Sequence, residues 1–194
     1  MLVAITGGIG CGKSVVSQLL TTMGYQVYDC DSNAKSLMLT DAELRNGLIS
    51  LFGQETYLAD GSLNKPHLSA SIFGNATALE QMNKLTHPAV AHDLLKRYSE
   101  SDSNQFFFYE SAILFESHFN QLAIPDRIIS VSAPLETRIE RVMKRDNTSR
   151  QRILERIGSQ MSQEDKDQLA DYVIFNDDSR SIISQIDNLL TTLK

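Results

Sequence analysis

The segment TGGIGCGKSVV, residues 6–16, places a lysine and a serine directly after a run of glycines. Gly7, four further residues and then Gly12, Lys13 and Ser14 fit the pattern GxxxxGK[ST]. In this pattern the glycine-rich turn points successive main-chain N–H groups at phosphate oxygens. Lys13 is therefore predicted to contact the β- and γ-phosphates of a nucleoside triphosphate, and Ser14 is predicted to bind Mg²⁺.

The segments on either side of the turn agree with this prediction. Residues 2–5 read as a short buried strand, and apolar residues recur at helical spacing after the turn until Gly24. The predicted nucleotide contacts are Gly8, Ile9, Gly10, Cys11, Gly12, Lys13, Ser14 and Val15. The alternative is an ordinary glycine-rich turn between a strand and a helix.

Carboxylates end two further predicted strands. Asp29 and Asp31 end the second strand in VYDCDSNAK, and ligands of open α/β sheets gather at the carboxyl ends of strands. One of the two is a candidate to accept the proton of an acceptor hydroxyl; on an extended segment their side chains would point to opposite sides. The alternative is a pair of turn or helix-capping aspartates. Glu110, at the end of FFFYE, is expected either to reach Mg²⁺ through water or to orient a loop.

A dense basic stretch follows the fourth predicted strand, after a helix start at Pro134. Arg138, Arg141 and Arg145 recur at spacings of three and four, so they are expected to share one helix face. In an acidic chain such clustering favours anionic ligand groups, and Arg141 and Arg145 are the candidates to stabilise phosphoryl transfer. A solvated helix face is the alternative. The complete basic set is Arg138, Arg141, Lys144, Arg145, Arg150, Arg152 and Arg156.

Composition limits the possible partners. The chain has 194 residues, 42% of them hydrophobic, and a formal net charge of −6, which argues against a nucleic-acid backbone as its main partner. Only two cysteines are present, Cys11 and Cys30, so a reducing compartment is favoured over a disulfide framework. The chain has no apolar stretch of 18 residues and no signal-peptide pattern, so we expect no membrane association and a cytoplasmic location.

Five short apolar strands are predicted with helical patterns between them, which indicates an α/β fold with a doubly wound parallel sheet. The predicted strands are residues 2–6, 26–29, 105–110, 127–132 and 172–175. The long interval between the second and third strands exceeds one crossover helix, so we expect a helical substrate-binding excursion at 32–104 in a single domain, 1–194, with a lid at 138–165. The excursion is expected to contain helices at 41–52 and after Asn64, a longer one interrupted at Pro88, and a polar loop at 99–105.

The ordered set of motifs resembles the dephospho-coenzyme A kinase family along nearly the whole chain. TGGIGCGKS resembles the family's phosphate loop, VYDCDSNAK its aspartate segment, DGSLNKPHLSASIF and LTHP its substrate excursion, AILFE its loop after the third strand, and RVMKRDNTSR its lid. The resemblance implies a P-loop kinase core that uses ATP and Mg²⁺ to phosphorylate the ribose 3′-hydroxyl of dephospho-coenzyme A. It also implies Asp31 as the group that orients this hydroxyl.

The resemblance implies further site residues as well. Contacts with the acceptor are expected from Asp31, Lys35, Lys65, His87, Leu114 and Glu116, and contact with the adenine of ATP from Asn176, for which a turn asparagine is the alternative. His87 is also read as structural, together with Pro88. Lys35 and Lys65 stand where arginine is common in the family, and lysine lacks the bidentate fork of arginine. A monomer or weak homo-oligomer is expected.

Three other functions remain as rivals. Another small-molecule or nucleotide kinase would share the phosphate loop and the lid arginines, and only the acceptor segments separate the two. A nucleotide-switch protein would require a base-reading aspartate after an Asn-Lys pair, but Asn64-Lys65 is followed by Pro66. A nucleic-acid-dependent ATPase is disfavoured by the negative net charge.

Overall fold

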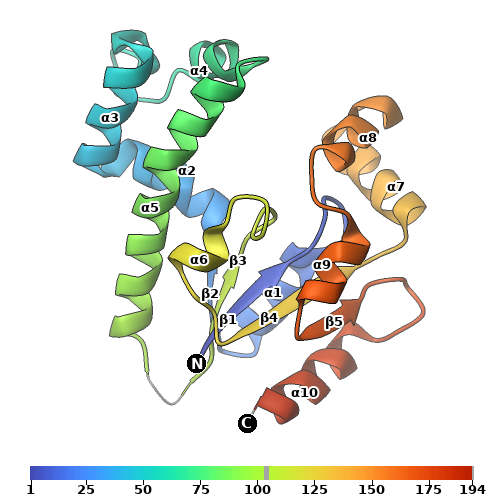
Figure 1. Cartoon of the computed structure of the whole chain (residues 1–194). Helices are drawn as coiled ribbons and strands as arrows, with labels where there is room; N and C mark the ends of the chain where they lie inside the picture. Colours follow the sequence, from blue (N-terminus) through green and yellow to red (C-terminus); the bar gives the residue numbers. More distant parts are fainter. Residues whose placement is uncertain (103–104, 194) are drawn as a thin grey trace. The chain divides into compact units, whose positions relative to one another are not determined.

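The structure is a computed structural model that describes residues 1–102 and 105–193 (Figure 1). Its strands are β1 (Leu2–Thr6), β2 (Gln26–Asp29), β3 (Phe107–Glu110), β4 (Arg127–Ser132) and β5 (Tyr172–Phe175). Its α-helices are α1 (Lys13–Thr22), α2 (Cys30–Thr40), α3 (Ala42–Phe52), α4 (Lys65–Ile72), α5 (Ala76–Glu100), α6 (Phe119–Leu122), α7 (Leu135–Asp146), α8 (Arg150–Gly158), α9 (Gln163–Leu169) and α10 (Ile182–Leu193), with a 3₁₀ turn at Gln54–Thr56.

The sheet has five strands in the order β2-β3-β1-β4-β5, and it is parallel, as predicted from the sequence. β1 lies at its centre, where β3 and β4 flank it with Leu2 opposite Phe107 and Val3 opposite Arg127. All five residues of β1 are buried, in agreement with its continuous apolar sequence. The carboxyl ends of β1, β3, β4 and β5 therefore meet at one edge, where the phosphate loop follows β1.

The chain divides into two compact units, Met1–Tyr28 with Tyr98–Lys194, and Asp29–Arg97. In the first unit, α1 and α10 cover one face of the strands, and their Val16, Leu20, Ile186 and Leu190 form the main core with apolar residues of β1, β3, β4 and β5. In Figure 1, α9 lies beside β4 and β5, and it contacts β4. This packing holds both ends of the phosphate loop, because one end is fixed in β1 and the other in α1.

The second unit is helical and has its own core. Met38, Leu44, Leu48 and Tyr57 are buried together, against apolar residues of α5 that include Leu85. The predicted helix at 41–52 is α3, capped at Asp41 by a carboxylate that accepts from Leu44 N–H at 2.8 Å. The helix predicted after Asn64 is α4, and Asn64 accepts from His67 N–H at 3.2 Å.

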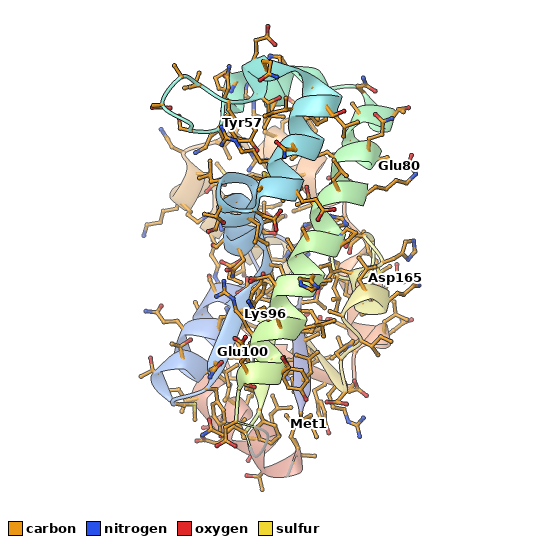
Figure 2. The ribbon with its side chains drawn as sticks, turned by 90° about the vertical axis from the view of Figure 1, so that its left-hand side faces the viewer. Met1, Tyr57, Glu80, Lys96, Glu100 and Asp165 are labelled. Carbon is orange, nitrogen blue, oxygen red and sulfur yellow. The ribbon has the colours of Figure 1, made fainter. Side chains whose placement is uncertain are left out.

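Pro88 does not interrupt the long helix, contrary to the prediction, because α5 runs from Ala76 to Glu100 with Pro88 inside it (Figure 2). A proline removes one N–H donor and bends a helix, but a long helix held by packing on both sides of the proline can continue. Buried residues on either side, among them Thr86 and Val90, supply that packing. The predicted loop at 99–105 also begins within this helix, and residues 103–104 lie outside the described residues.

Two other boundary predictions were wrong. β3 begins at Phe107 and not at residue 105, because β1 begins at Leu2, opposite Phe107, and offers no strand residue further upstream to pair with. The segment from Asp29 to Asp31 is not extended, because α2 begins at Cys30. Asp29 is instead the N-cap of α2, and Asp31 lies in its first turn, so the prediction that their side chains alternate has no structural basis.

Candidate active site

The phosphate loop between β1 and α1 presses closely against two other segments of its unit. Gly12 has a φ of 93°, in the left-handed region, and a Cβ there would overlap the Nδ2 atom of Asn176. Gly10 has a φ of 81°, and a Cβ there would overlap the main-chain oxygen of Arg138. Side chains larger than hydrogen are thus excluded at both positions by backbone conformation and by space.

The polar main-chain groups of this loop fall into two sets. The N–H groups of Gly8 and Ile9 donate to the side-chain oxygens of Gln163 and Gln160, each at 2.9 Å. The carbonyl of Gly8 accepts from Nζ of Lys13 and from the N–H of Cys11, and the carbonyl of Ile9 accepts from Nε of Arg138. Within residues 1–102 and 105–193, no acceptor is recorded for the N–H groups of Gly10, Gly12, Lys13 and Ser14. These four groups include the first N–H groups of α1, which an anion can satisfy.

Lys13 is buried, with 8% of its surface exposed. Its Nζ atom donates to the carbonyls of Gly7 at 3.0 Å and Gly8 at 3.4 Å, so the cation lies across the loop that carries the free N–H groups. A cation in this position attracts phosphate oxygens bound by the loop. The residues thus fit an ATP phosphate chain.

Ser14 is exposed at the start of α1, as is Val15. One turn further on, the hydroxyl of Ser17 donates to Oε2 of Glu110 at 2.6 Å, so the carboxylate at the end of β3 is held against α1. Ser14 supplies a hydroxyl oxygen, and Glu110 supplies a carboxylate oxygen at the edge where β3 ends. Hard oxygen donors of this kind suit Mg²⁺, so the residues fit the metal that a phosphate loop requires.

The three arginines of α7 differ in their surroundings. Arg138 is buried, its Nε donates to the carbonyl of Ile9 at 3.0 Å, and burial lowers the pKa of its guanidinium against the opposing attraction of nearby acidic groups. Arg141 is partly buried and donates to Asn176 and, at 3.0 Å, to Asp178. Arg145 is exposed and pairs with its neighbour Asp146 at 2.7 Å, which raises the pKa of the arginine.

Asn176 follows β5 and is buried beside the loop. Its Nδ2 donates to the carbonyl of Cys11 at 2.9 Å, and its Oδ1 accepts from Arg141 at 3.2 Å. The residue therefore links α7 to the phosphate loop.

Comparison with known proteins identifies the family. A family model described as dephospho-CoA kinase matches residues 1–181. A dephospho-CoA kinase from Bacteroides fragilis is 43% identical over 191 residues, which covers 98% of this chain and 92% of the relative. The chain belongs to the dephospho-CoA kinase family. As a member of this family it is an enzyme with dephospho-CoA kinase activity, the last step of coenzyme A biosynthesis.

Solved structures agree with this assignment at the level of the fold. A crystal structure of a Thermus thermophilus protein matches with a TM-score of 0.84 and 30% identity, covering 100% of this chain and 98% of the other. The dephospho-CoA kinase of Campylobacter jejuni matches with a TM-score of 0.71 and 24% identity, covering 100% and 98%. The fold is that of the P-loop kinases.

The loop after β3 carries two residues that the family resemblance assigns to the acceptor. Leu114 is fully buried, so direct contact with a ligand would require the loop to move. Glu116 pairs with Lys166 at 2.7 Å and accepts from the N–H of Met161 at 2.9 Å. In this conformation both residues support the loop, and their contact with the acceptor stays a prediction.

The remaining residues that the dephospho-CoA kinase resemblance assigns to the acceptor lie in the helical unit. Asp31 is exposed in the first turn of α2, Lys35 is exposed one turn later, and Lys65 is exposed at the start of α4. Asp29 accepts from the N–H groups of Asp31 and Ser32, which makes it a structural cap. His87 is partly buried in α5, and burial lowers its pKa.

Sequence reasoning missed three residues of this kinase that lie around the loop. Gln163 accepts from the N–H of Gly8, and Gln160 accepts from the N–H of Ile9. Lys166 is fully buried between Glu116 and the carbonyl of Ala112, and this burial lowers the pKa of Lys166. The pattern Ser162 to Asp165 could have located the start of α9, because it is a capping box in type and spacing. No local signal points from α9 to the loop.

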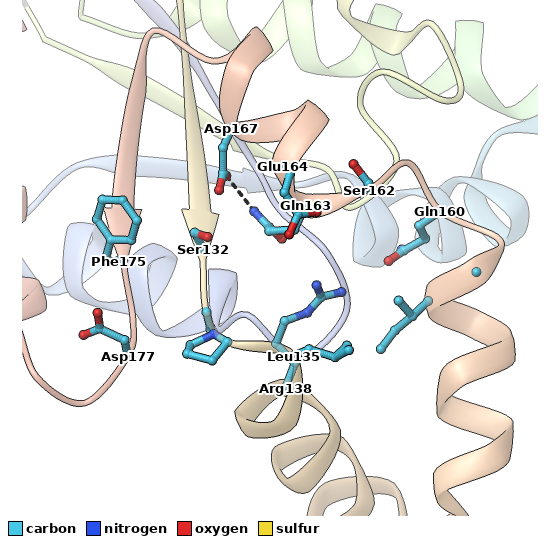
Figure 3. A pocket seen from close by; sticks show the side chains of 14 residues that line it. Ser132, Leu135, Arg138, Gln160, Ser162, Gln163, Glu164, Asp167, Phe175 and Asp177 are labelled. Atoms are coloured by element: carbon cyan, nitrogen blue, oxygen red, sulfur yellow. Dashed lines mark hydrogen bonds between the residues drawn. The ribbon is translucent and has the colours of Figure 1, made fainter.

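Arg138, Gln160 and Gln163 also line a pocket of about 560 Å³ in this unit (Figure 3). Three carboxylates, Glu164, Asp167 and Asp177, line the same pocket.

Among the helices within residues 1–102 and 105–193, none combines the length and the apolar character that a membrane-spanning helix needs.

Proposed function

We propose that the protein transfers the γ-phosphoryl group of ATP, with Mg²⁺, to the ribose 3′-hydroxyl of dephospho-coenzyme A. The observation that carries the proposal is the phosphate loop itself, in which four closely spaced N–H groups have no acceptor within the described part of the chain while Lys13 lies across the loop. This arrangement suits a triphosphate chain. The family supplies the acceptor.

The loop binds the phosphates through the N–H groups of Gly10, Gly12, Lys13 and Ser14, and the side chain of Lys13 balances their charge. Ser14 would hold Mg²⁺, which when bound would neutralise negative charge on the phosphates. Arg141 and Arg145 stabilise the spread negative charge of the transferring group. Asn176 borders the base of the nucleotide, where it also fixes Arg141.

Asp31 orients the acceptor hydroxyl and accepts its proton. It lies in the first turn of α2, which directly follows the second strand of a parallel sheet, and such strand ends gather ligands. Asp29 is already committed to capping α2, so Asp31 is the carboxylate of the pair that is available for this role. Lys35, Lys65 and His87 contact the acceptor from the same helical unit. The protein acts in the cytoplasm as a monomer or weak homo-oligomer.

The test is incubation with ATP, Mg²⁺ and dephospho-coenzyme A, followed by the mass and regiochemistry of the product. A product heavier by one phosphoryl group at the ribose 3′ position supports the proposal. Phosphorylation of shikimate or a nucleoside monophosphate in place of dephospho-coenzyme A would overturn the acceptor. ATP hydrolysis that depends on added nucleic acid would overturn the reaction class.

A further inference from the structure

We infer that Gln160 and Gln163 are positioning residues for ATP: they hold the Gly8–Ile9 edge of the phosphate loop so that the following N–H groups keep a phosphate-binding arrangement. The inference rests on the proposed function for the use of ATP. Neither residue touches the reacting atoms in this assignment. Their action is through the main chain of the loop.

The first support is the division of labour within the loop. The N–H groups of Gly8 and Ile9 and the carbonyl of Ile9 are held by side chains from distant segments, and the carbonyl of Gly8 accepts from Lys13 and Cys11 within the loop. The N–H groups of Gly10, Gly12, Lys13 and Ser14 have no acceptor among the described residues, whereas that of Cys11 turns back to the carbonyl of Gly8 at 3.3 Å. An edge whose hydrogen bonds are all made by protein is a fixed support, whereas open N–H groups are available to a ligand. The loop thus has a held half and a binding half.

The second support is the environment of Gln163, which is buried at the first position of α9. Its Oε1 accepts from Gly8, and its Nε2 donates to Ser130 at 3.1 Å, Val131 at 3.2 Å and Asp167 at 2.7 Å. A buried amide with every donor and acceptor engaged has one stable orientation, because each alternative leaves a polar group without a partner. Gln163 therefore ties Gly8 to β4 and α9.

The third support concerns Gln160, which is less buried than Gln163 but lies in a segment that is itself anchored. Gln160 is only partly buried, and among the described residues its side chain makes one hydrogen bond, in which it accepts from the N–H of Ile9. Figure 3 shows Gln160 and Gln163 approaching Arg138 from two sides, and Arg138 holds the carbonyl of Ile9. Gln160 lies in the short segment between α8 and α9, where Glu116 fixes the adjacent Met161 N–H. The segment itself is thus anchored before it reaches the loop.

Methionine substitutions test the inference, because methionine has nearly the length of glutamine and lacks its amide. Gln160→Met should weaken ATP binding by about fivefold to thirtyfold, the range expected when one main-chain N–H loses its partner. Gln163→Met should have the larger effect, because a buried amide in contact with four partners is removed. The KM for dephospho-coenzyme A should stay within about twofold for both, on the same reasoning.

A matched control is Asp126→Ala. Its carboxylate accepts from the N–H of Leu2 at 2.7 Å, so it also holds the main chain of the segment that leads to the loop, but at the opposite end of β1. This variant should lower the thermal unfolding midpoint and leave ATP binding unchanged. ATP dissociation constants come from calorimetry with Mg²⁺ present and no acceptor.

The expected result is a raised ATP dissociation constant in Gln160→Met and Gln163→Met, and an unchanged one in Asp126→Ala. If the glutamine variants lose stability like the control yet bind ATP as the wild type does, their role is structural and the inference is overturned. Should Gln163→Met fail to fold, Gln160→Met alone decides. Because no acceptor is present, an error in the proposed acceptor leaves this readout intact, whereas a wild type that binds no ATP overturns the proposed function itself.

Discussion

Replacement of Lys13 by alanine should separate the chemical role of this residue from its contribution to stability. The side chain is buried and donates to Gly7 at 3.0 Å and to Gly8 at 3.4 Å. Only the first distance is that of a well-formed hydrogen bond. The carbonyl of Gly8 keeps a second donor, the N–H of Cys11 at 3.3 Å. The variant therefore loses one hydrogen bond from a charged donor and leaves one carbonyl without a partner.

A loss of this kind destabilises a protein by about 1–3 kcal/mol. For a chain of nearly two hundred residues that corresponds to a fall of about 2–12 °C in the unfolding midpoint. Even if the wild type were stable by only about 5 kcal/mol, more than about nine-tenths of the variant would remain folded. Stability alone can thus explain almost none of any lost activity.

The catalytic loss should be far larger. One preorganised donor at a site of developing charge contributes about 10² to 10³ in turnover, and Lys13 also carries a full charge. Turnover should be measured with ATP, Mg²⁺ and dephospho-coenzyme A, beside a thermal unfolding curve of each sample. Lys144→Ala, which removes an exposed lysine of α7, is the matched control and should keep turnover within about twofold.

Two outcomes would refute this reasoning. A folded Lys13→Ala protein with turnover within about threefold of the wild type would mean that the cation does not serve the phosphates, because a donor in that position contributes far more. A protein that fails to fold would mean that the hydrogen bonds to the loop carbonyls outweigh the range expected for such contacts.

Three further predictions test the remaining assignments. Arg141→Ala and Arg145→Ala should each lower turnover by about 10³-fold or more if they stabilise the transferring group, and steady-state kinetics in which both keep over half of the activity would favour a solvated helix face. Asp31→Asn should lower turnover by about 10²- to 10³-fold with ATP affinity unchanged, whereas Asp29→Asn, which alters the cap of α2, should mainly lower the unfolding midpoint; an exchange of these phenotypes would reverse the assignment. Burial lowers the pKa of His87 in the folded protein. As the pH falls below about 6.5, the unfolded chain therefore takes up a proton before the folded protein does, and the wild type loses stability. His87→Gln should lack this loss, and parallel denaturant-unfolding profiles for the two proteins between pH 7.5 and 5.5 would contradict the prediction.

The parts of the fold that could be predicted from the sequence depend on contacts between near neighbours. The phosphate loop is one, because Gly7 to Ser14 carry its geometry within a single turn. The caps at Asp41 and Asn64 are others, because each accepts from an N–H three residues later. The parallel sheet followed from the alternation of strands and helices, since crossover helices join parallel strands, whereas the order of the strands was not predicted.

The parts that could not be predicted depend on distant partners. Gln163 meets Gly8 across 155 positions, and Gln160 meets Ile9 across 151, and glutamine has no strong local preference that would indicate such a role. Lys166 looks like an exposed lysine of a polar helix, yet it is fully buried beside Glu116. The start of β3 likewise depends on where β1 begins. Such features appear only when the chain is folded.

Electrostatics also explains why the side chains that hold the phosphate loop are neutral. The acceptors for the N–H groups of Gly8 and Ile9 are neutral side-chain amides. A carboxylate in either place, at about 5 Å from a bound phosphate oxygen, would repel that oxygen by about 3 kcal/mol at an effective dielectric constant of about 20. Three carboxylates of this unit are engaged by donors: Glu116 by Lys166, Asp167 by Gln163 and Ser130, and Asp178 by Arg141. In a chain with a net charge of −6, two cations thus stay directed at the loop, because Lys13 and Arg138 donate to main-chain carbonyls and neither forms an ion pair with a carboxylate among the described residues.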